Sequence, residues 1–181
     1  IGAAVLGLVL GLSAARAAEP SATLAAVKAR GVLVCGMQGD NPPFSAPDGK
    51  GEWHGMDVTS CRALAAAVLG DPDKAQIRVV TGMTRFPALQ SGEVDVLFGS
   101  TTWVTTRETS LGLSFAATNY YSGQGFLVRK SLGVSHVREL DGASICVSAG
   151  STNELNLADW ARTNGVRVNP VVFENPTDTR S

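Results

Sequence analysis

The chain has 181 residues, of which 44% are hydrophobic and 17% are charged, and its formal net charge is −1. This composition supplies enough apolar material for one globular domain or two small α/β lobes, and it excludes disordered and fibrous classes. Because the basic residues form no run and do not interleave with aromatic residues, nucleic acid is not expected as a partner.

The N-terminal segment predicts export. The first twelve residues form an apolar run of h-region length, and Ala15-Arg16-Ala17 has the small-x-small pattern that precedes a signal peptidase cut. We therefore expect residues 1–17 to be a signal peptide that lacks its N-terminal basic part, and the mature protein to reside in the periplasm. The alternative is a membrane anchor, but the run is shorter than the ~20 residues that a span requires.

Short apolar runs alternate with helical patterns in the first part of the chain. A helix is expected over 23–30, with Thr23 as its N-cap and Gly31 as its stop. The following elements are a strand over 32–35, a helix from its N-cap Asp57 to Gly70, a strand over 76–80, a helix over 84–91 and a strand over 94–98. Turn residues predict irregular loops over 41–44 and 47–51. This order predicts a doubly wound parallel sheet, which binds ligands at the carboxyl ends of its strands.

A second α/β unit is expected after a crossing segment. Residues 119–130 combine two tyrosines and two glycines with an extended apolar run. Beyond them, the pattern predicts a strand over 143–148, a tight loop over 149–152, a helix over 154–162 and a strand over 166–173. We expect lobe one over 18–118, a hinge crossing over 119–130 and the beginning of lobe two over 131–181.

The three cysteines are disulfide candidates, because export implies an oxidising compartment and their spacing matches no zinc pattern. Cys35 lies in the first predicted strand and Cys61 in the helix that follows, and such elements normally pack together. A Cys35–Cys61 disulfide is therefore expected, with two buried thiols as the alternative. Cys146 is left over, which indicates a partner in sequence beyond these 181 residues. No metal and no cofactor are expected.

The strongest candidate site follows the strand over 94–98. The segment Ser100-Thr101-Thr102-Trp103-Val104-Thr105-Thr106-Arg107 combines hydroxyl groups with one arginine, the side chain best suited to bidentate binding of a carboxylate. A capped helix start with a surface arginine would explain the pattern equally well. The turn Gly150-Ser151-Thr152 offers backbone N–H groups at a helix N-terminus, which suits an anion. Catalytic motifs are lacking, and His54 and His136 are expected in solvated loops, so no enzyme is predicted.

These segments together resemble family 3 of the bacterial extracellular solute-binding proteins, in particular the general L-amino-acid-binding proteins of ABC transporters. The resemblance covers roughly residues 23–174. It rests on five ordered segments, namely Gly55-Met56-Asp57-Val58, residues 88–97, Thr101-Thr102-Trp103 with Arg107, residues 119–126, and residues 154–159. Val104, Met56 and Thr59 depart from the family pattern and bear on specificity.

The resemblance implies a type 2 periplasmic binding fold, in which two doubly wound lobes close on the ligand about a hinge. It implies that Arg107 binds the ligand α-carboxylate, that Thr102 offers its hydroxyl and that the Ser100 carbonyl faces the α-ammonium. Ser151 and Thr152, after Gly150, would add backbone N–H groups to the carboxylate. The implied protein is a monomer that captures free L-amino acids, polar or of broad range, and delivers them to a membrane permease.

Two alternatives use the same scaffold, namely a periplasmic dehydratase-type enzyme and the sensor module of a receptor. The resemblance also implies that the acidic residue for the ligand ammonium and a second hinge strand lie later than residue 181. Lobe two is thus expected to be truncated. We expect the 181-residue piece by itself to bind an amino acid weakly or not at all.

Overall fold

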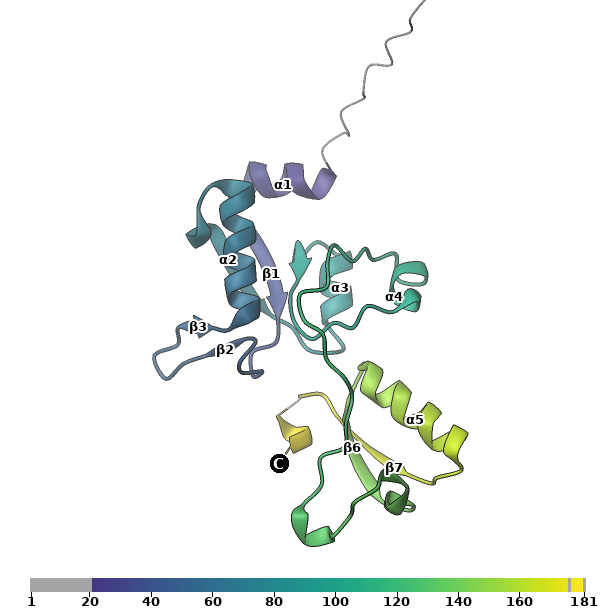
Figure 1. Ribbon diagram of the computed structural model, residues 1–181. Coiled ribbons are helices and arrows are strands. Elements are labelled where there is room, and N and C mark those ends of the chain that lie inside the picture. Colours follow the sequence, from purple (N-terminus) through teal and green to yellow (C-terminus); the bar gives the residue numbers. More distant parts are fainter. Residues whose placement is uncertain (1–20, 176, 181) are drawn as a thin grey trace, which may run out of the picture.

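The computed structural model describes residues 21–175 and 177–180, which form two α/β units joined by an extended segment (Figure 1). The predicted signal peptide, residues 1–17, lies outside these residues. Within them, no helix has the length and apolar character needed to span a membrane.

A three-stranded parallel sheet organises the N-terminal unit. Strand β1 (Leu33–Met37) lies between β4 (Ala75–Val79) and β5 (Val96–Leu97) and runs parallel to both. Its side chains are nearly all buried, which explains why the strand reads as a continuous apolar run. The helices of this unit are α1 (Ala22–Arg30), α2 (Met56–Leu69), η1 (Pro72–Lys74), α3 (Arg85–Gln90) and α4 (Thr105–Thr109). The predicted parallel sheet is confirmed.

The core of the N-terminal unit lies where β1 meets α1 and α2. Its buried members are Val27, Leu33, Cys35, Met37, Val58, Cys61 and Ala65. A smaller cluster of Val80, Ala88 and Val94 packs α3 against the same sheet. The regularly spaced apolar residues of α2 thus lie on one helix face, which packs against β1, as the sequence pattern indicates.

A disulfide joins Cys35 of β1 to Cys61 of α2, with a Cα–Cα distance of 6.2 Å. Both residues are fully buried. The prediction of this pairing is therefore confirmed, and the alternative of two buried thiols is wrong. Cys146 is a free, exposed thiol on the C-terminal unit.

The C-terminal unit is a two-stranded parallel sheet with one long helix. Strands β6 (Ser144–Ser148) and β7 (Asn169–Phe173) pair in parallel, and α5 (Thr152–Asn164) connects them. Leu157 and Ala161 of α5 are buried. Short 3-10 helices lie at η2 (Lys130–Leu132), η3 (Val137–Leu140) and η4 (Asp178–Arg180). The extended segment 112–129, which contains no helix or strand, leads from one unit to the other (Figure 1).

Two predicted helix starts are corrected. Helix α1 is capped by Ser21 rather than Thr23, because the Ser21 hydroxyl accepts the Leu24 N–H at 3.2 Å. Helix α2 begins after Gly55, whose φ of 123° favours glycine, so Asp57 lies in its first turn.

The segment expected to be an irregular loop contains a small hairpin. Strands β2 (Ala46–Pro47) and β3 (Trp53–His54) pair antiparallel, and the turn is closed by the bond from the Asp48 N–H to the Glu52 carbonyl. His54 therefore belongs to a strand, although its side chain is exposed as predicted.

Removal of the disulfide should destabilise the N-terminal unit. Replacing both Cys35 and Cys61 by alanine is expected to lower the free energy of unfolding by about 3.5 kcal/mol, because the bond closes a loop of sequence separation 26. Urea unfolding followed by circular dichroism measures the change. Cys146→Ser, at the free thiol, is the matched control and should leave the midpoint unchanged. An unchanged midpoint in the double variant would contradict the prediction.

Candidate functional site

The candidate site lies at the carboxyl edge of the N-terminal sheet. Because β1, β4 and β5 are parallel, the loops that follow them emerge at the same edge. These loops are residues 38–41 after β1, 80–84 after β4 and 98–104 after β5. The C-terminal unit contacts this edge through the loop between β6 and α5.

Arg107 is buried in helix α4, with 6% of its surface exposed. Its guanidinium donates to the Thr102 carbonyl oxygen at 2.5 Å and lies 5.0 Å from the centre of the Phe86 ring. Burial lowers the pKa of Arg107, since desolvation disfavours the charged form. The interpretation of Arg107 as a surface arginine is therefore wrong.

A second buried arginine, Arg85, was missed in the sequence. It opens α3, is 5% exposed, and its guanidinium lies 4.7 Å from the centre of the same Phe86 ring. It donates to the Gly150 carbonyl oxygen at 3.1 Å and makes long contacts of 3.5 Å to the Ser100 carbonyl and the Thr101 hydroxyl. Burial, and then the charge of Arg107, lower the pKa of Arg85 to about 10.

The two buried guanidinium groups place positive charge at the junction of the two units. Neither forms an ion pair with a carboxylate in the described part of the chain, and the buried Nε of Arg85 has no hydrogen-bond partner there. Buried charges are normally paired, because desolvation is costly. A ligand carboxylate would supply the missing negative charge and would accept hydrogen bonds from the guanidinium groups.

Ser100 lies in an unusual backbone conformation, with a φ of 42°. Its hydroxyl accepts a hydrogen bond from the Asn41 side-chain amide at 2.9 Å, and the same amide donates to the Gln38 side chain at 3.2 Å. The loop after β5 is thereby tied to the loop after β1. Non-glycine residues with a positive φ are often found at functional sites, where the surrounding structure holds them in this conformation.

The Gly150-Ser151-Thr152 turn faces this edge from the C-terminal unit. The Thr152 and Thr102 hydroxyls are 3.0 Å apart, and the Gly150 carbonyl accepts from Arg85. Ser151 caps α5 by accepting the Glu154 N–H at 3.2 Å, while the Glu154 carboxylate accepts the Gly150 N–H at 3.2 Å. The first N–H groups of α5, from Thr152 onward, have no partner within the helix.

The structure thus brings the six predicted residues to one junction between the units. Ser100, Thr102 and Arg107 lie on the N-terminal side, and Gly150, Ser151 and Thr152 lie on the other. The Gly150 N–H is already bonded within its own turn, whereas the helix N-terminus beside it remains suited to an anion.

A cavity of about 380 Å³ lies between the same two units. It is lined by Gln38, Gly39, Asp40, Val79, Val80, Thr81, Asn175, Thr177 and Asp178, and by none of the six predicted residues. The Thr177 hydroxyl donates to the Asp40 carboxylate at 2.6 Å. Gln38 connects the cavity to Ser100 through Asn41, so the cavity and the arginine pair belong to one region.

Asp57 is a buried acid beneath the candidate site. Its Oδ2 has no hydrogen-bond partner among residues 21–175 and 177–180, and it lies 3.6 Å from where a Cβ would stand on Gly99. Burial raises the pKa of the Asp57 carboxyl. Asp57 thus lies close to the loop that carries Ser100.

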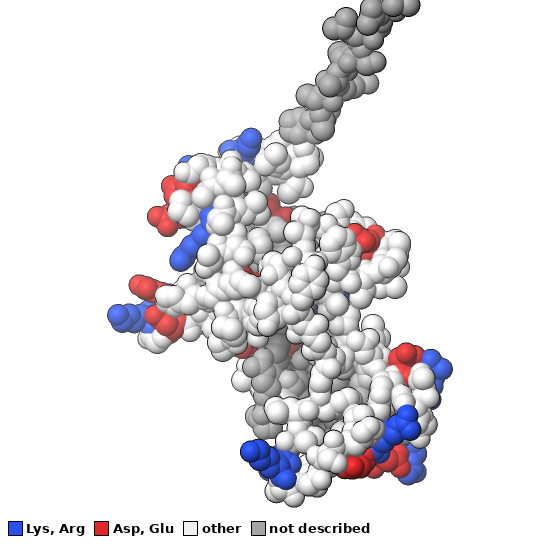
Figure 2. All heavy atoms as spheres, in the orientation of Figure 1, with Lys and Arg blue, Asp and Glu red and all other residues white. Residues whose placement is uncertain are grey.

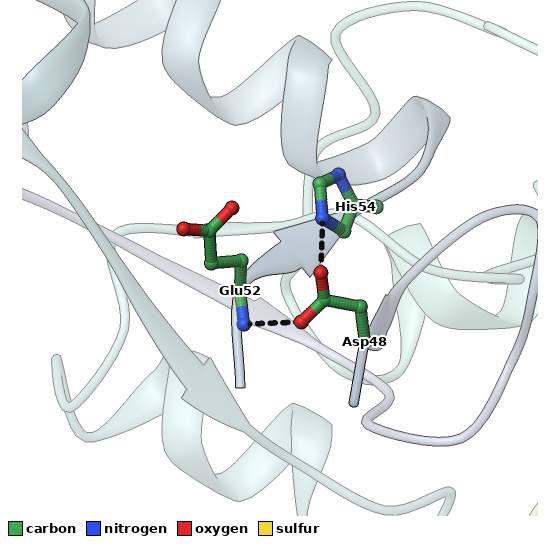
Figure 3. Close-up of side chains that lie close together, drawn as sticks. All are labelled: Asp48, Glu52 and His54. Atoms are coloured by element: carbon green, nitrogen blue, oxygen red, sulfur yellow. Dashed lines mark hydrogen bonds and ion pairs between the residues drawn. The ribbon is translucent and has the colours of Figure 1, made fainter. Parts of the chain in front are cut away.

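A separate cluster of Asp48, Glu52 and His54 lies on the β2–β3 hairpin (Figure 3). One atom from each residue could ligate a metal, since these atoms lie within 4.8 Å of one another, but all three residues are exposed. Asp48 accepts the N–H groups of Glu52 and Lys50 and contacts His54, and the two backbone bonds lower the pKa of its carboxyl. The hydrogen bonds of this turn explain why the three side chains lie close together.

The chain belongs to the family of bacterial extracellular solute-binding proteins, family 3, which it matches over residues 33–168. It is 52% identical over 175 residues to the general L-amino acid-binding periplasmic protein AapJ of Rhizobium johnstonii, covering 97% of this chain and 50% of AapJ. It is 54% identical over 154 residues to the glutamate/glutamine/aspartate/asparagine-binding protein BztA of Rhodobacter capsulatus, covering 85% of this chain and 46% of BztA. The chain therefore spans about half the length of these relatives.

Solved structures agree with this assignment. A periplasmic binding protein of an ABC transporter from Brucella ovis, with glutathione bound, has a TM-score of 0.81 and 51% identity over 87% of this chain and 50% of that protein. The ancestral amino acid-binding protein AncCDT-1, a precursor of cyclohexadienyl dehydratase, has a TM-score of 0.72 and 26% identity over 87% of this chain and 68% of that protein. The fold is that of the type 2 periplasmic binding proteins, as predicted.

The buried Asp57 should give stability a characteristic dependence on pH. Its pKa is raised above 3.8 in the folded state, so the fold holds this proton more tightly than the unfolded chain does. The resulting stabilisation is complete below 3.8 and is lost as the pH rises through the folded pKa. The free energy of unfolding of the parent relative to Asp57→Asn should thus be lower at about pH 7 than at about pH 3.

Urea unfolding of both proteins at the two pH values measures this difference. If the difference were the same at both pH values, or rose with pH, the assignment of a raised pKa to Asp57 would be refuted.

Proposed function

We propose that this chain is part of the periplasmic substrate-binding component of an ABC importer for free L-amino acids. The observation that carries the proposal is the pair of buried arginines, Arg85 and Arg107, at the junction of two α/β units without a carboxylate partner in the described residues. The printed names of AapJ and BztA support the ligand class, because both are amino-acid-binding proteins.

Predicted residues of both units contribute to the proposed site. Arg107 binds the ligand α-carboxylate, for which its burial without an acidic partner is the supporting observation. Thr102 offers its hydroxyl from the same loop, and the Ser100 carbonyl faces the α-ammonium. Ser151 and Thr152 add backbone N–H groups at the start of α5, where the helix dipole favours negative charge.

Arg85 adds a second cation to this site. Two guanidinium groups favour a ligand with more than one carboxylate or with a carboxylate and a polar side chain. The range printed for BztA, which includes glutamate and aspartate with their amides, fits this charge pattern. The glutathione bound to the Brucella ovis protein makes that peptide a second candidate, because glutathione also carries a free α-amino and α-carboxyl group.

The proposed lobes follow the two α/β units. Lobe one is residues 18–118, the hinge crossing is 119–130, and residues 131–181 begin lobe two. Export through a signal peptide at residues 1–17, a monomeric state and delivery to a membrane permease complete the proposal. The extended conformation of segment 112–129 and the contacts between the units support a hinged arrangement.

A binding role is favoured over an enzyme on the same scaffold. AapJ and BztA are named as binding proteins, and AncCDT-1 is itself named as an amino acid-binding protein although it is a precursor of a dehydratase. The loops at the sheet edge contribute hydroxyl groups and arginines, while His54 lies on the exposed hairpin and His136 caps η3.

Arg107→Ala should abolish most of the binding. In the protein expressed from its complete gene, we expect affinity for the best-bound amino acid of a panel to fall by at least about 30-fold, or about 2 kcal/mol, since a buried charge-assisted contact is lost. Isothermal titration calorimetry with a panel of L-amino acids and glutathione measures this. Arg62→Ala, at an exposed arginine of α2, is the matched control and should bind as the parent does.

The outcomes separate two claims. Binding by Arg107→Ala within about threefold of the parent would show that Arg107 does not hold the carboxylate. No binding by the parent to any member of the panel would contradict the proposed function itself. Urea unfolding of the unliganded variant distinguishes lost binding from lost folding.

A further inference from the structure

The two α/β units approach each other backbone to backbone beside the candidate site. Gly82 lies in the loop between β4 and α3, and it faces Ala149 and Gly150 between β6 and α5. A Cβ on Gly82 would stand 2.4 Å from the Ala149 carbonyl oxygen. A Cβ on Gly150 would stand 3.0 Å from the Gly82 carbonyl oxygen and 3.1 Å from the Met83 sulfur.

At position 82, a side chain is disfavoured by steric crowding rather than by the backbone conformation. Gly82 is not among the glycines with positive φ, so alanine could adopt its conformation. The obstacle at 2.4 Å is a backbone carbonyl, which cannot move aside as a flexible side chain can. An added methyl group would therefore have to separate the two loops.

Two polar contacts between the units lie beside this glycine contact. Arg85, three residues after Gly82, donates to the Gly150 carbonyl at 3.1 Å, and the Thr102 and Thr152 hydroxyls are 3.0 Å apart. Separation of the loops by a methyl group would lengthen both contacts. The glycine contact thus lies among the contacts that join the two sides of the candidate site.

We propose that Gly82 and Gly150 form the contact that limits closure of the two units, and that Gly82 is a positioning residue for ligand binding. A side chain at Gly82 would hold the units apart, so that Arg85 no longer reaches Gly150 and the two sides cannot enclose a bound amino acid. This inference deepens the proposed function and rests on it for the effect on affinity, although closure itself can be tested without any ligand.

Cross-linking tests closure directly. In the protein expressed from its complete gene, Thr102→Cys and Thr152→Cys, combined with Cys146→Ser, place two thiols where the hydroxyls now meet. Under a mild oxidant we expect these thiols to form a disulfide, and adding Gly82→Ala should slow its formation at least about tenfold. Gly49→Ala is the matched control, since Gly49 is exposed, has an ordinary φ and would place its Cβ in open space.

Affinity for L-glutamate provides the second measurement, by calorimetry and by stopped-flow dissociation. Gly82→Ala should weaken binding at least about tenfold, mainly through faster dissociation, and Gly82→Val should weaken it further. Unfolding of the protein in urea without ligand should be the same for the parent, Gly82→Ala and Gly49→Ala, because Gly82 lies at the junction and not in the core clusters of the N-terminal unit.

The results separate the two proposals. Equal cross-linking rates for the parent and Gly82→Ala would overturn the closure role of Gly82, whatever the ligand. A loss of unliganded stability that accounts for the change in affinity would overturn it as well. Failure of the parent to bind any amino acid, with cross-linking still slowed by Gly82→Ala, would reject the proposed function and leave the closure contact supported.

Discussion

The parallel pairing of β1 with β4 and β5 is the constraint on which the rest of the structure depends. It places the carboxyl ends of three strands at one edge, so that Gln38, Arg85 and Arg107 reach a common region from distant parts of the chain. Helix α2 is joined to strand β1 by the Cys35–Cys61 disulfide. A small sheet of three strands can therefore present a site with fixed geometry.

The junction between the two units combines charge with close backbone approach. Charged side chains of both signs are interspersed over the face of the molecule drawn in Figure 2, mostly toward the periphery of each unit. The arginine pair instead lies inside, near loops of hydroxyl groups and glycines. Short polar residues let the two sides approach each other while the buried guanidinium groups supply attraction for an anion. In the proposed function, recognition and closure would therefore use the same few loops.

Much of the fold follows from local pattern, whereas part of the site depends on contacts that local pattern does not reveal. The apolar runs at β1 and β5 and the stop at Gly70 predict the sheet and helices, because they reflect burial and backbone conformation within a few residues. The disulfide was also predictable, since Cys35 and Cys61 lie in elements that pack together. The hairpin of β2 and β3 was missed because its strands are two residues long and one contains proline.

The burial of Arg85 could not be predicted from the sequence. Its position at the start of a short helix is typical of a solvated arginine, whereas in the structure it donates to the Gly150 carbonyl of the other unit, 65 residues away. The available signal was its place six residues after the end of β4, at the same strand edge as Arg107. The proposed role of Gly82 could not be predicted for a similar reason, because its lack of a side chain matters only where the Ala149 carbonyl approaches it.

The Phe86 ring lies close to both buried arginines. Its centre lies within 5.0 Å of both guanidinium carbons, so two like charges are held near one apolar ring. The ring face offers each cation a weak attraction, but it cannot neutralise either. The two guanidinium groups therefore repel each other, and the charge of Arg107 is one cause of the lowered pKa of Arg85. In the proposed site, an anion between them would offset this repulsion as well as accept hydrogen bonds, so the arginine pair would contribute to binding in two ways.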